Sequence, residues 1–197
     1  MTIETRSKFE NKFYDITHLI QKEFDRNLRK YGSKIQCRRG CSQCCSQIFN
    51  ITLIDANVIA EHVKRLPDEK KELLKMKAKK YMELRSRTKV PERDKPEFTL
   101  KPGIACPALG EEGECTIYEA RPVICRRFGI PIYEYKSPDK VYACELNFKN
   151  GEEIEDGALI PNQTAIGKKW DELKEQFNNN YGDKKYFTTI AEAILSA

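Results

Sequence analysis

The stretch Cys37-Arg38-Arg39-Gly40-Cys41-Ser42-Gln43-Cys44-Cys45 contains four of the eight cysteines in this chain. The other four follow singly, and they are Cys106, Cys115, Cys125 and Cys144. Thiolates at this density are typical ligands of soft metals, and such metals fold a chain around themselves. We therefore expect a metal site that ties both halves of the chain together, with the metal contributing directly to folding.

The composition indicates one soluble globular domain over residues 1–197, with its motif core at about residues 37–148. Hydrophobic residues make up 40% of the chain and charged residues 33%. The first ten residues contain no apolar signal core, and no stretch approaches the length of a membrane span. We expect a cytoplasmic protein without a membrane span. A reducing compartment favours metal binding over disulfides, although eight cysteines leave four disulfides as an alternative.

The net charge of +5 has a local origin. Between Asp68 and Lys89 there are nine Lys or Arg and four Asp or Glu, so the rest of the chain balances to zero. A basic helix is usually a solvated face, and binding of nucleic acid or of an acidic partner is the alternative. No aromatic residues interleave with these charges in the way that single-strand binding requires, which makes nucleic acid an unfavoured partner.

Periodic apolar residues predict a mostly α-helical fold. Thr52 is the expected N-cap of one helix, with Asp55 completing an acidic capping box. A short strand is expected at Cys115–Tyr118, and Ile130–Tyr135 with Val141–Cys144 predicts a small β-hairpin. The helices are expected at residues 5–31, 52–66, 68–87, 119–128, from beyond Pro161 to Tyr181, and 187–195. A linker is expected at residues 88–102, and the metal site is expected in loops between helices.

The combined pattern has four parts: Cys37-x3-Cys41-x2-Cys44-Cys45, Cys106-Pro-Ala-Leu, Cys115-Thr-Ile-Tyr-Glu-Ala-Arg-Pro-Val-Ile-Cys125-Arg-Arg-Phe, and Cys144. It resembles the YkgJ-like cysteine-cluster family, which is named for its CxxCxxCC signature and described as a zinc- or iron-chelating domain. The match spans about residues 37–148, although the first gap has three residues where the family name implies two. The resemblance implies metal chelation. A flagellin lysine methylase has a similar cluster motif, which adds a methylase-type enzyme as a less favoured alternative.

All eight cysteines are candidate metal ligands, enough for two four-thiolate sites or for one site with spare thiols. Consecutive side chains diverge in most backbone conformations. We therefore expect Cys45 to belong to a different metal or thiol environment from Cys44. Cations can offset the charge of several thiolates, although ordinary surface charge is the alternative for each of them. The candidates for this charge balance are Lys34, Arg38, Arg39, Arg121, Arg126 and Arg127.

An iron–sulfur cluster, with [4Fe–4S] favoured, is preferred over zinc because zinc sites usually pair two Cys-x2-Cys knuckles. The favoured role is electron transfer or redox chemistry with a partner protein. The alternative is a structural or storage zinc module that mediates interactions. The spacing Cys37-x3-Cys41-x2-Cys44 also fits a radical-SAM enzyme, but the chain lacks the strand–helix alternation of the usual barrel.

Other candidates carry weaker signals. His18 and His62 lie away from the centres of their apolar stripes, and ligation by His62 is the less favoured reading. The four tyrosines close to cysteines in sequence are expected to shield the site rather than to react; they are Tyr118, Tyr133, Tyr135 and Tyr142. No phosphate-binding loop, serine nucleophile elbow or pair of catalytic carboxylates is recognisable, so the sequence leaves open whether the protein is an enzyme.

Overall fold

The computed structural model describes residues 3–38, 40–88, 103–138, 141–181 and 187–197. The chain forms two compact units, each built from two separate stretches: residues 1–38 with 123–183 in unit 1, and 39–122 with 184–197 in unit 2. The described residues contain six α-helices and two antiparallel strand pairs, which confirms the predicted mostly helical class. No described helix is long and apolar enough to cross a membrane. A single domain over the whole chain stays a prediction.

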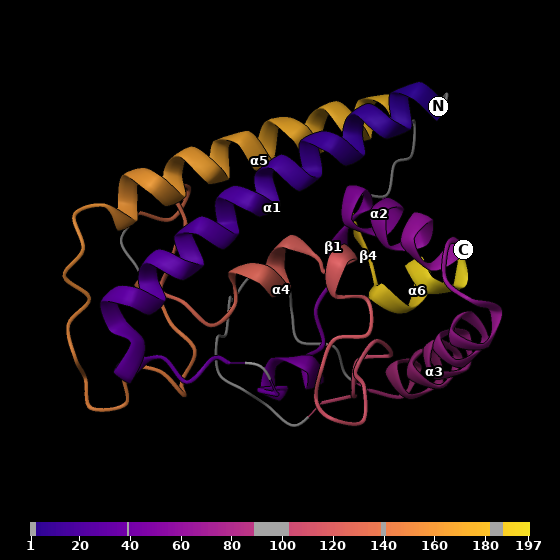
Figure 1. The fold of residues 1–197 in the computed structure, drawn as a ribbon, viewed down its shortest axis with the longest axis horizontal. Coiled ribbons are helices and arrows are strands. Elements are labelled where there is room, and N and C mark those ends of the chain that lie inside the picture. Colours follow the sequence, from indigo (N-terminus) through magenta and orange to yellow (C-terminus); the bar gives the residue numbers. More distant parts are fainter. Residues whose placement is uncertain (1–2, 39, 89–102, 139–140, 182–186) are drawn as a thin grey trace. The chain divides into compact units, whose positions relative to one another are not determined.

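Unit 1 is built on two long antiparallel helices, α1 (Ile3–Tyr31) and α5 (Leu159–Tyr181), which lie side by side in Figure 1. Their shared face is aromatic. Phe9 meets Phe177 edge-on at 5.2 Å between ring centroids, and Phe13 meets Trp170 at 6.1 Å. Rings of this size bury a large apolar area, which stabilises the helix pair. The periodic apolar residues in the first two thirds of this helix therefore lie in the core of unit 1; they are Phe9, Phe13, Ile16 and Ile20.

Further along α1, the buried face becomes polar. Glu23 and Asn27 are buried, whereas their apolar neighbours Phe24 and Leu28 are only half-buried. The Glu23 carboxylate accepts hydrogen bonds from Asn27 and Arg26 and from Asn162 of α5. A buried charge needs such partners to offset its loss of hydration. This network therefore joins α1 and α5 where the aromatic contacts end.

A short hairpin and a short helix complete unit 1. Strands β2 (Ile132–Tyr133) and β3 (Val141–Tyr142) pair antiparallel, which confirms the predicted hairpin. On α5, the side chain of Gln163 accepts from the Tyr133 amide and donates to the carbonyl of Pro131, which fixes β2 to α5. Helix α4 (Val123–Arg127) packs on α1. The turn η1 (Gly32–Lys34) follows α1.

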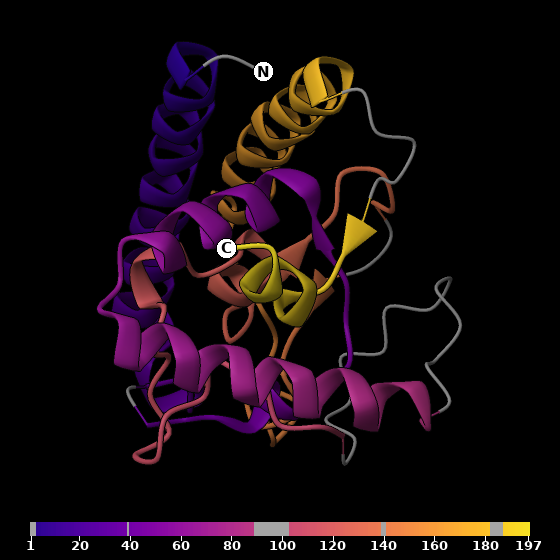
Figure 2. The ribbon, with the colours of Figure 1, turned by 90° about the vertical axis from the view of Figure 1, so that its right-hand side faces the viewer.

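Unit 2 contains three helices, α2 (Leu53–Lys64), α3 (Asp68–Ser86) and α6 (Ile190–Leu195). Helix α6 packs on both α2 and α3, as Figure 2 shows. Strand β1 (Ile51–Thr52), which precedes α2, pairs antiparallel with β4 (Phe187–Thr188), which precedes α6. The predicted capping box of Thr52 and Asp55 is confirmed, and Thr189 and Glu192 form a second one at α6.

Two predicted elements differ from the structure. The strand predicted at Cys115–Tyr118 is wrong: Cys115 makes one isolated bridge with Leu109, and the turn η3 (Tyr118–Ala120) follows. The helix predicted over 119–128 is divided into η3 and α4. Arg121 has extended backbone angles there, since the residue before a proline is disfavoured in the helical region. The predicted linker lies outside the described residues beyond Thr88.

Candidate metal centre

All eight cysteines lie in described residues, and none of them forms a disulfide. Unit 2 holds Cys41, Cys44, Cys45, Cys106 and Cys115, while unit 1 holds Cys37, Cys125 and Cys144. Cys144 is buried and the other seven are half-buried. Each unit therefore has its own set of thiols, which are considered in turn.

In unit 2, Cys44 and Cys45 lie in the turn η2 (Gln43–Ser46), and Cys106 is fixed beside them by the backbone. The Cys106 amide donates to the carbonyl of Cys45 at 2.7 Å. Gly103 allows this approach, because a Cβ atom there would overlap the carbonyl oxygen of Ser46. A larger residue at position 103 would therefore push the Cys106 segment away from η2.

A tight turn brings Cys115 near Cys106. The amide of Thr116 donates to Ala108 O at 2.8 Å, and the amide of Gly110 donates to Glu114 O at 2.8 Å. Between these bonds Leu109 and Cys115 form the isolated bridge. Cys115 is then close enough for a charge on its thiolate to raise the pKa of Cys106.

The thiols of unit 2 differ in acidity because their surroundings differ. A hydrogen bond from the Cys45 side chain lowers the pKa of Cys44 to about 6; burial opposes this effect, and the Arg121 cation adds to it. Burial raises the pKa of Cys106 to about 12; the neighbouring charges of Cys115 and Cys44 add to this, and the Ala108 amide opposes it. Cys44 is therefore a thiolate at neutral pH, while Cys106 keeps its proton until a cation binds.

The contact between Cys44 and Cys45 bears on one expectation. We expected consecutive side chains to diverge, whereas a hydrogen bond from the Cys45 side chain reaches Cys44. The tight backbone of η2 gives the physical reason, since neighbouring side chains in a 3₁₀ turn are not held on opposite faces as they are in a strand. The assignment of the two cysteines to different metal or thiol environments stays a prediction.

The donor set of unit 2 fits a soft metal in its chemistry. Cys44, Cys45, Cys106 and Cys115 supply four thiols, the number that a Zn²⁺ ion or an iron–sulfur cluster takes. Within the part of the chain that the structure describes, however, no three Cys, His, Asp or Glu side chains meet in ligating geometry. Electrostatic influence extends well beyond a metal–sulfur bond of about 2.3 Å, so these thiols are neighbours that would have to close further around a metal.

Unit 1 holds its thiols by packing and backbone hydrogen bonds. Cys37 packs against a buried apolar cluster around Tyr31 and Ile130, and its sulfur lies 3.9 Å from Phe128 O. The next residue, Gly129, has φ of +107°, and a Cβ atom there would overlap the Cys37 side chain. Only glycine suits both the backbone angle and the close approach.

Asn147 joins the three segments that carry or adjoin the thiols of unit 1. Its side-chain oxygen accepts from the Gln36 amide and its side-chain nitrogen donates to Gly129 O, both at 2.8 Å. Its own amide donates to Cys144 O at 2.8 Å. The residue is buried and is followed by Phe148 in a left-handed conformation with φ of +51°. Nothing in the sequence pattern singled out Asn147, because a lone asparagine near a cysteine carries no periodic signal.

The predicted charge-balancing residues take different positions. Arg121 lies close enough to Cys44 to lower its pKa. Arg127 instead pairs with Glu134 at 2.7 Å and donates to Tyr133 O. Arg38 is exposed, Arg126 lies on α4, and Arg39 falls outside the described residues. Structural support for the predicted charge balance is therefore found at Arg121.

His62 shows no tie to the thiols. It lies half-buried on α2, and burial and the Arg65 cation lower its pKa, with Glu119 opposing them. Its electrostatic neighbours are therefore charged side chains rather than cysteines. Ligation by His62 stays a prediction without support from these contacts.

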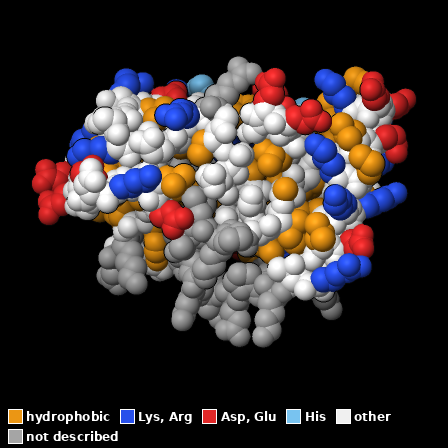
Figure 3. All heavy atoms as spheres, turned by 90° about the horizontal axis from the view of Figure 1, so that it is seen from below, with side chains coloured by type: hydrophobic (Ala, Val, Ile, Leu, Met, Phe, Trp, Pro, Cys, Tyr) orange, Lys and Arg blue, Asp and Glu red, His pale blue; other side chains and the backbone are white. Residues whose placement is uncertain are grey.

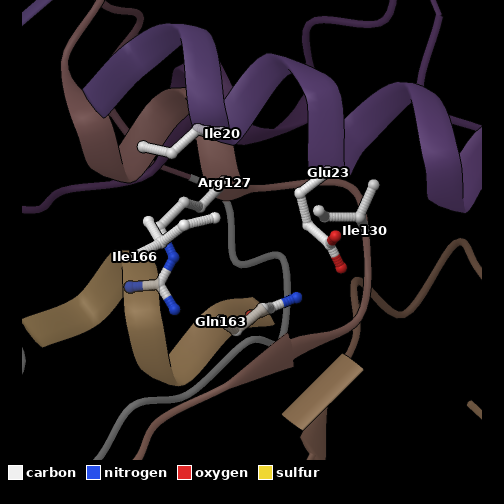
Figure 4. Close-up of a pocket in the computed structure, with 6 residues that line it drawn as sticks. All are labelled: Ile20, Glu23, Arg127, Ile130, Gln163 and Ile166. Carbon is white, nitrogen blue, oxygen red and sulfur yellow. The ribbon is translucent and has the colours of Figure 1, made fainter. Parts of the chain in front are cut away.

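Figure 4 shows a cavity in unit 1 beside Arg127, lined also by Ile20, Glu23 and Gln163. Its volume of about 10 Å³ leaves room for about one water molecule at most. The polar side chains around it already have partners within unit 1. The cavity therefore is too small and too well satisfied to hold a substrate.

Comparisons with known proteins identify a family for the chain. The family model CxxCxxCC, described as a "putative zinc- or iron-chelating domain", matches residues 36–145. These residues include all eight cysteines and more than half of the chain. No curated protein and no solved structure matches. The chain belongs to the CxxCxxCC family of zinc- or iron-chelating domains.

Proposed function

We propose that the protein carries a cysteine-ligated iron–sulfur cluster, with [4Fe–4S] favoured, and acts in electron transfer or another redox role. The observation that carries this proposal is the gathering of four thiols in unit 2, at Cys44, Cys45, Cys106 and Cys115. They come from two separate segments, as ligands of a folded cluster site do. The other cysteines are proposed as further ligands or as redox-active thiols.

The surroundings of these sulfurs support a cluster. The Ala108 amide donates toward Cys106, and the Arg121 cation lies near Cys44. When bound, an iron–sulfur cluster supplies reversible electron storage, and hydrogen bonds and charges around its sulfurs tune its reduction potential. Arg121 would offset the excess negative charge of four thiolates, and Ala108 would orient the Cys106 sulfur.

A structural zinc module is the second candidate, because Zn²⁺ takes the same four thiolates. It predicts a tightly bound ion without redox chemistry. A radical-SAM enzyme gains no support, because the described strands form only two-stranded pairs and no β/α barrel. No contact among the described residues favours a methylase-type enzyme.

Anaerobic purification with metal and acid-labile sulfide analysis tests the proposal. We expect iron and sulfide in equal amounts, and an absorbance change between about 350 and 450 nm on reduction that reverses on oxidation. Zinc without sulfide in protein that was never exposed to air would instead support the zinc module. Absence of both metals would contradict either candidate.

A matched pair of variants tests the ligand assignment. Cys106→Ser should remove most of the bound metal, because serine oxygen is a poor ligand for soft metals. Ser42→Ala changes a hydroxyl just before η2, the turn beside Cys106, and should leave the metal content unchanged. Equal metal contents in the two variants would exclude Cys106 as a ligand.

A further inference from the structure

Helix α3 presents a second apolar surface besides the one that packs in unit 2. Its inner side buries Leu74, Ala78 and Tyr81. A different stripe, at intervals of three, four and four residues, contains Leu73, Met76, Lys80 and Leu84, which we call the outer stripe. Its three apolar members are 48%, 61% and 41% exposed. Figure 3 shows hydrophobic side chains between Lys and Arg side chains at the right-hand end, where α3 lies.

The helix that carries the outer stripe is basic. Three of the four acidic residues of α3 fall in its first five positions, and beyond them Glu83 is already paired with Arg87 at 2.8 Å. Of the basic residues, Lys71 pairs with Asp68. Lys70, Lys79 and Lys80 make no ion pair with any residue that the structure describes. Helix α3 has seven Lys or Arg and four Asp or Glu, which gives it +3 of the chain's net charge of +5, partly as lysines without a local counter-charge.

This helix also contacts the segment that carries the thiols of unit 2. Lys77 donates to Leu109 O at 3.0 Å, and Leu109 forms the bridge with Cys115. A protein bound along the outer stripe would lie beside the turn that joins Cys106 to Cys115.

We propose that the outer stripe of α3 is a docking surface for an acidic protein partner that presents an apolar helix face edged by Asp and Glu. The charge of α3 complements such a partner, and exposed Leu and Met side chains fit the apolar anchors of a helix. Nucleic acid fits less well, since apolar side chains gain nothing from phosphates and the only aromatic residue of α3, Tyr81, is buried. Docking itself does not depend on the bound metal. The idea that a docked partner exchanges electrons with the metal centre rests on the proposed function.

A selection with displayed helical peptides tests this surface and does not require the partner to be identified first. A random library would be selected against the full chain and depleted with the double variant Leu73→Ser/Met76→Ser. We expect the enriched peptides to combine an apolar stripe with Asp and Glu at its edges. The best peptide would then be titrated against single variants by fluorescence anisotropy, with polyuridylate as a nucleic-acid competitor.

The controls match the test variants in exposure and charge. Lys80→Glu and Leu73→Ser should each weaken binding about tenfold or more. Lys169→Glu and Ile160→Ser change an exposed lysine and an apolar residue, 49% exposed, on α5 of unit 1, and both should leave binding unchanged. Melting curves of all four variants would show that each is folded.

Three results would overturn the proposal. The first is enrichment of peptides without acidic residues, and the second is an equal loss of peptide affinity in test and control variants. The third is displacement of the labelled peptide by polyuridylate at a lower concentration than by unlabelled peptide. The same titration with metal-loaded and metal-free protein separates this inference from the proposed function. If anaerobically purified protein contains no iron and still binds the peptide at α3, the docking surface is retained and the cluster is rejected.

Discussion

The two units hold their thiols by different means. In unit 2, the thiols influence one another and Arg121 through charge, so their proton affinities differ by several pKa units. In unit 1, Cys37 is held by apolar packing and by Asn147, which bonds to the segments on either side of it. The electrostatic coupling among the thiols of unit 2 favours binding of a metal cation there, while packing in unit 1 fixes the position of the Cys37 sulfur. We therefore propose that unit 2 supplies the primary metal site, while packing fixes the position of Cys37 in unit 1.

Removing the metal should have the largest effect. Chelation under reducing conditions should lower the melting temperature by more than about 10 °C, since metal binding contributes directly to folding. Trp170, the only tryptophan, lies in α5 of unit 1, so its fluorescence reports that unit, whereas circular dichroism reports both. If unit 2 holds the primary site, the transition seen by circular dichroism should fall further than the one seen by fluorescence. An unchanged melting curve after verified metal loss would reject a role of the metal in folding.

Two glycines allow each unit to be perturbed by itself. Gly103→Ala and Gly129→Ala should each cost about 2–4 kcal/mol in free energy of unfolding, because both added methyl groups overlap existing atoms. Gly103→Ala should increase alkylation of Cys106, and Gly129→Ala should increase alkylation of Cys37. Mass spectrometry of the alkylated metal-free protein measures both. Increased labelling of the same cysteine in both variants would contradict the separation of the two sets.

Asn147→Ala should cost about 2–3 kcal/mol, because it removes two side-chain hydrogen bonds and leaves the buried carbonyl of Gly129 without this partner. Urea unfolding measures this loss. Asn150→Ala is the control: its side chain bonds only to Glu152 on the exposed surface, and the change should cost less than about 0.5 kcal/mol. Equal costs would show that Asn147 does not organise the thiols of unit 1.

The smallest effect concerns pH in the reduced, metal-free protein. The pKa of Cys44 is lowered to about 6 from 9.0, so its contribution to stability should grow as the pH rises from 6 to 9. The pKa of Cys106 is raised to about 12, so its contribution should be lost as the pH rises from 9 to 12. Together these two groups predict greatest stability near pH 9.

Arg121→Met should raise the pKa of Cys44, and the pH dependence of the Cys44 alkylation rate measures the shift.

Much of the fold follows from local patterns. The stripe on α1 and the capping box at Thr52 are short-range signals, and both appear in the structure. The burial of Glu23 in place of Phe24 depends on Asn162, which is far away in the sequence, so no local pattern could reveal it. The cysteine spacing likewise identified the metal-chelating family correctly. It could not show that Cys44 and Cys45 are in contact, because that depends on the 3₁₀ conformation of η2.

The packing of α6 on α2 and α3 has a consequence for synthesis of the chain. The ribosome completes α3 about a hundred residues before α6, at roughly 5–20 residues per second. For on the order of ten seconds, the buried faces of α2 and α3 lack the helix that covers them. The nascent thiols of η2 and of the 106–115 turn are already present during this interval. Early metal delivery or a chaperone would protect them from oxidation until unit 2 closes.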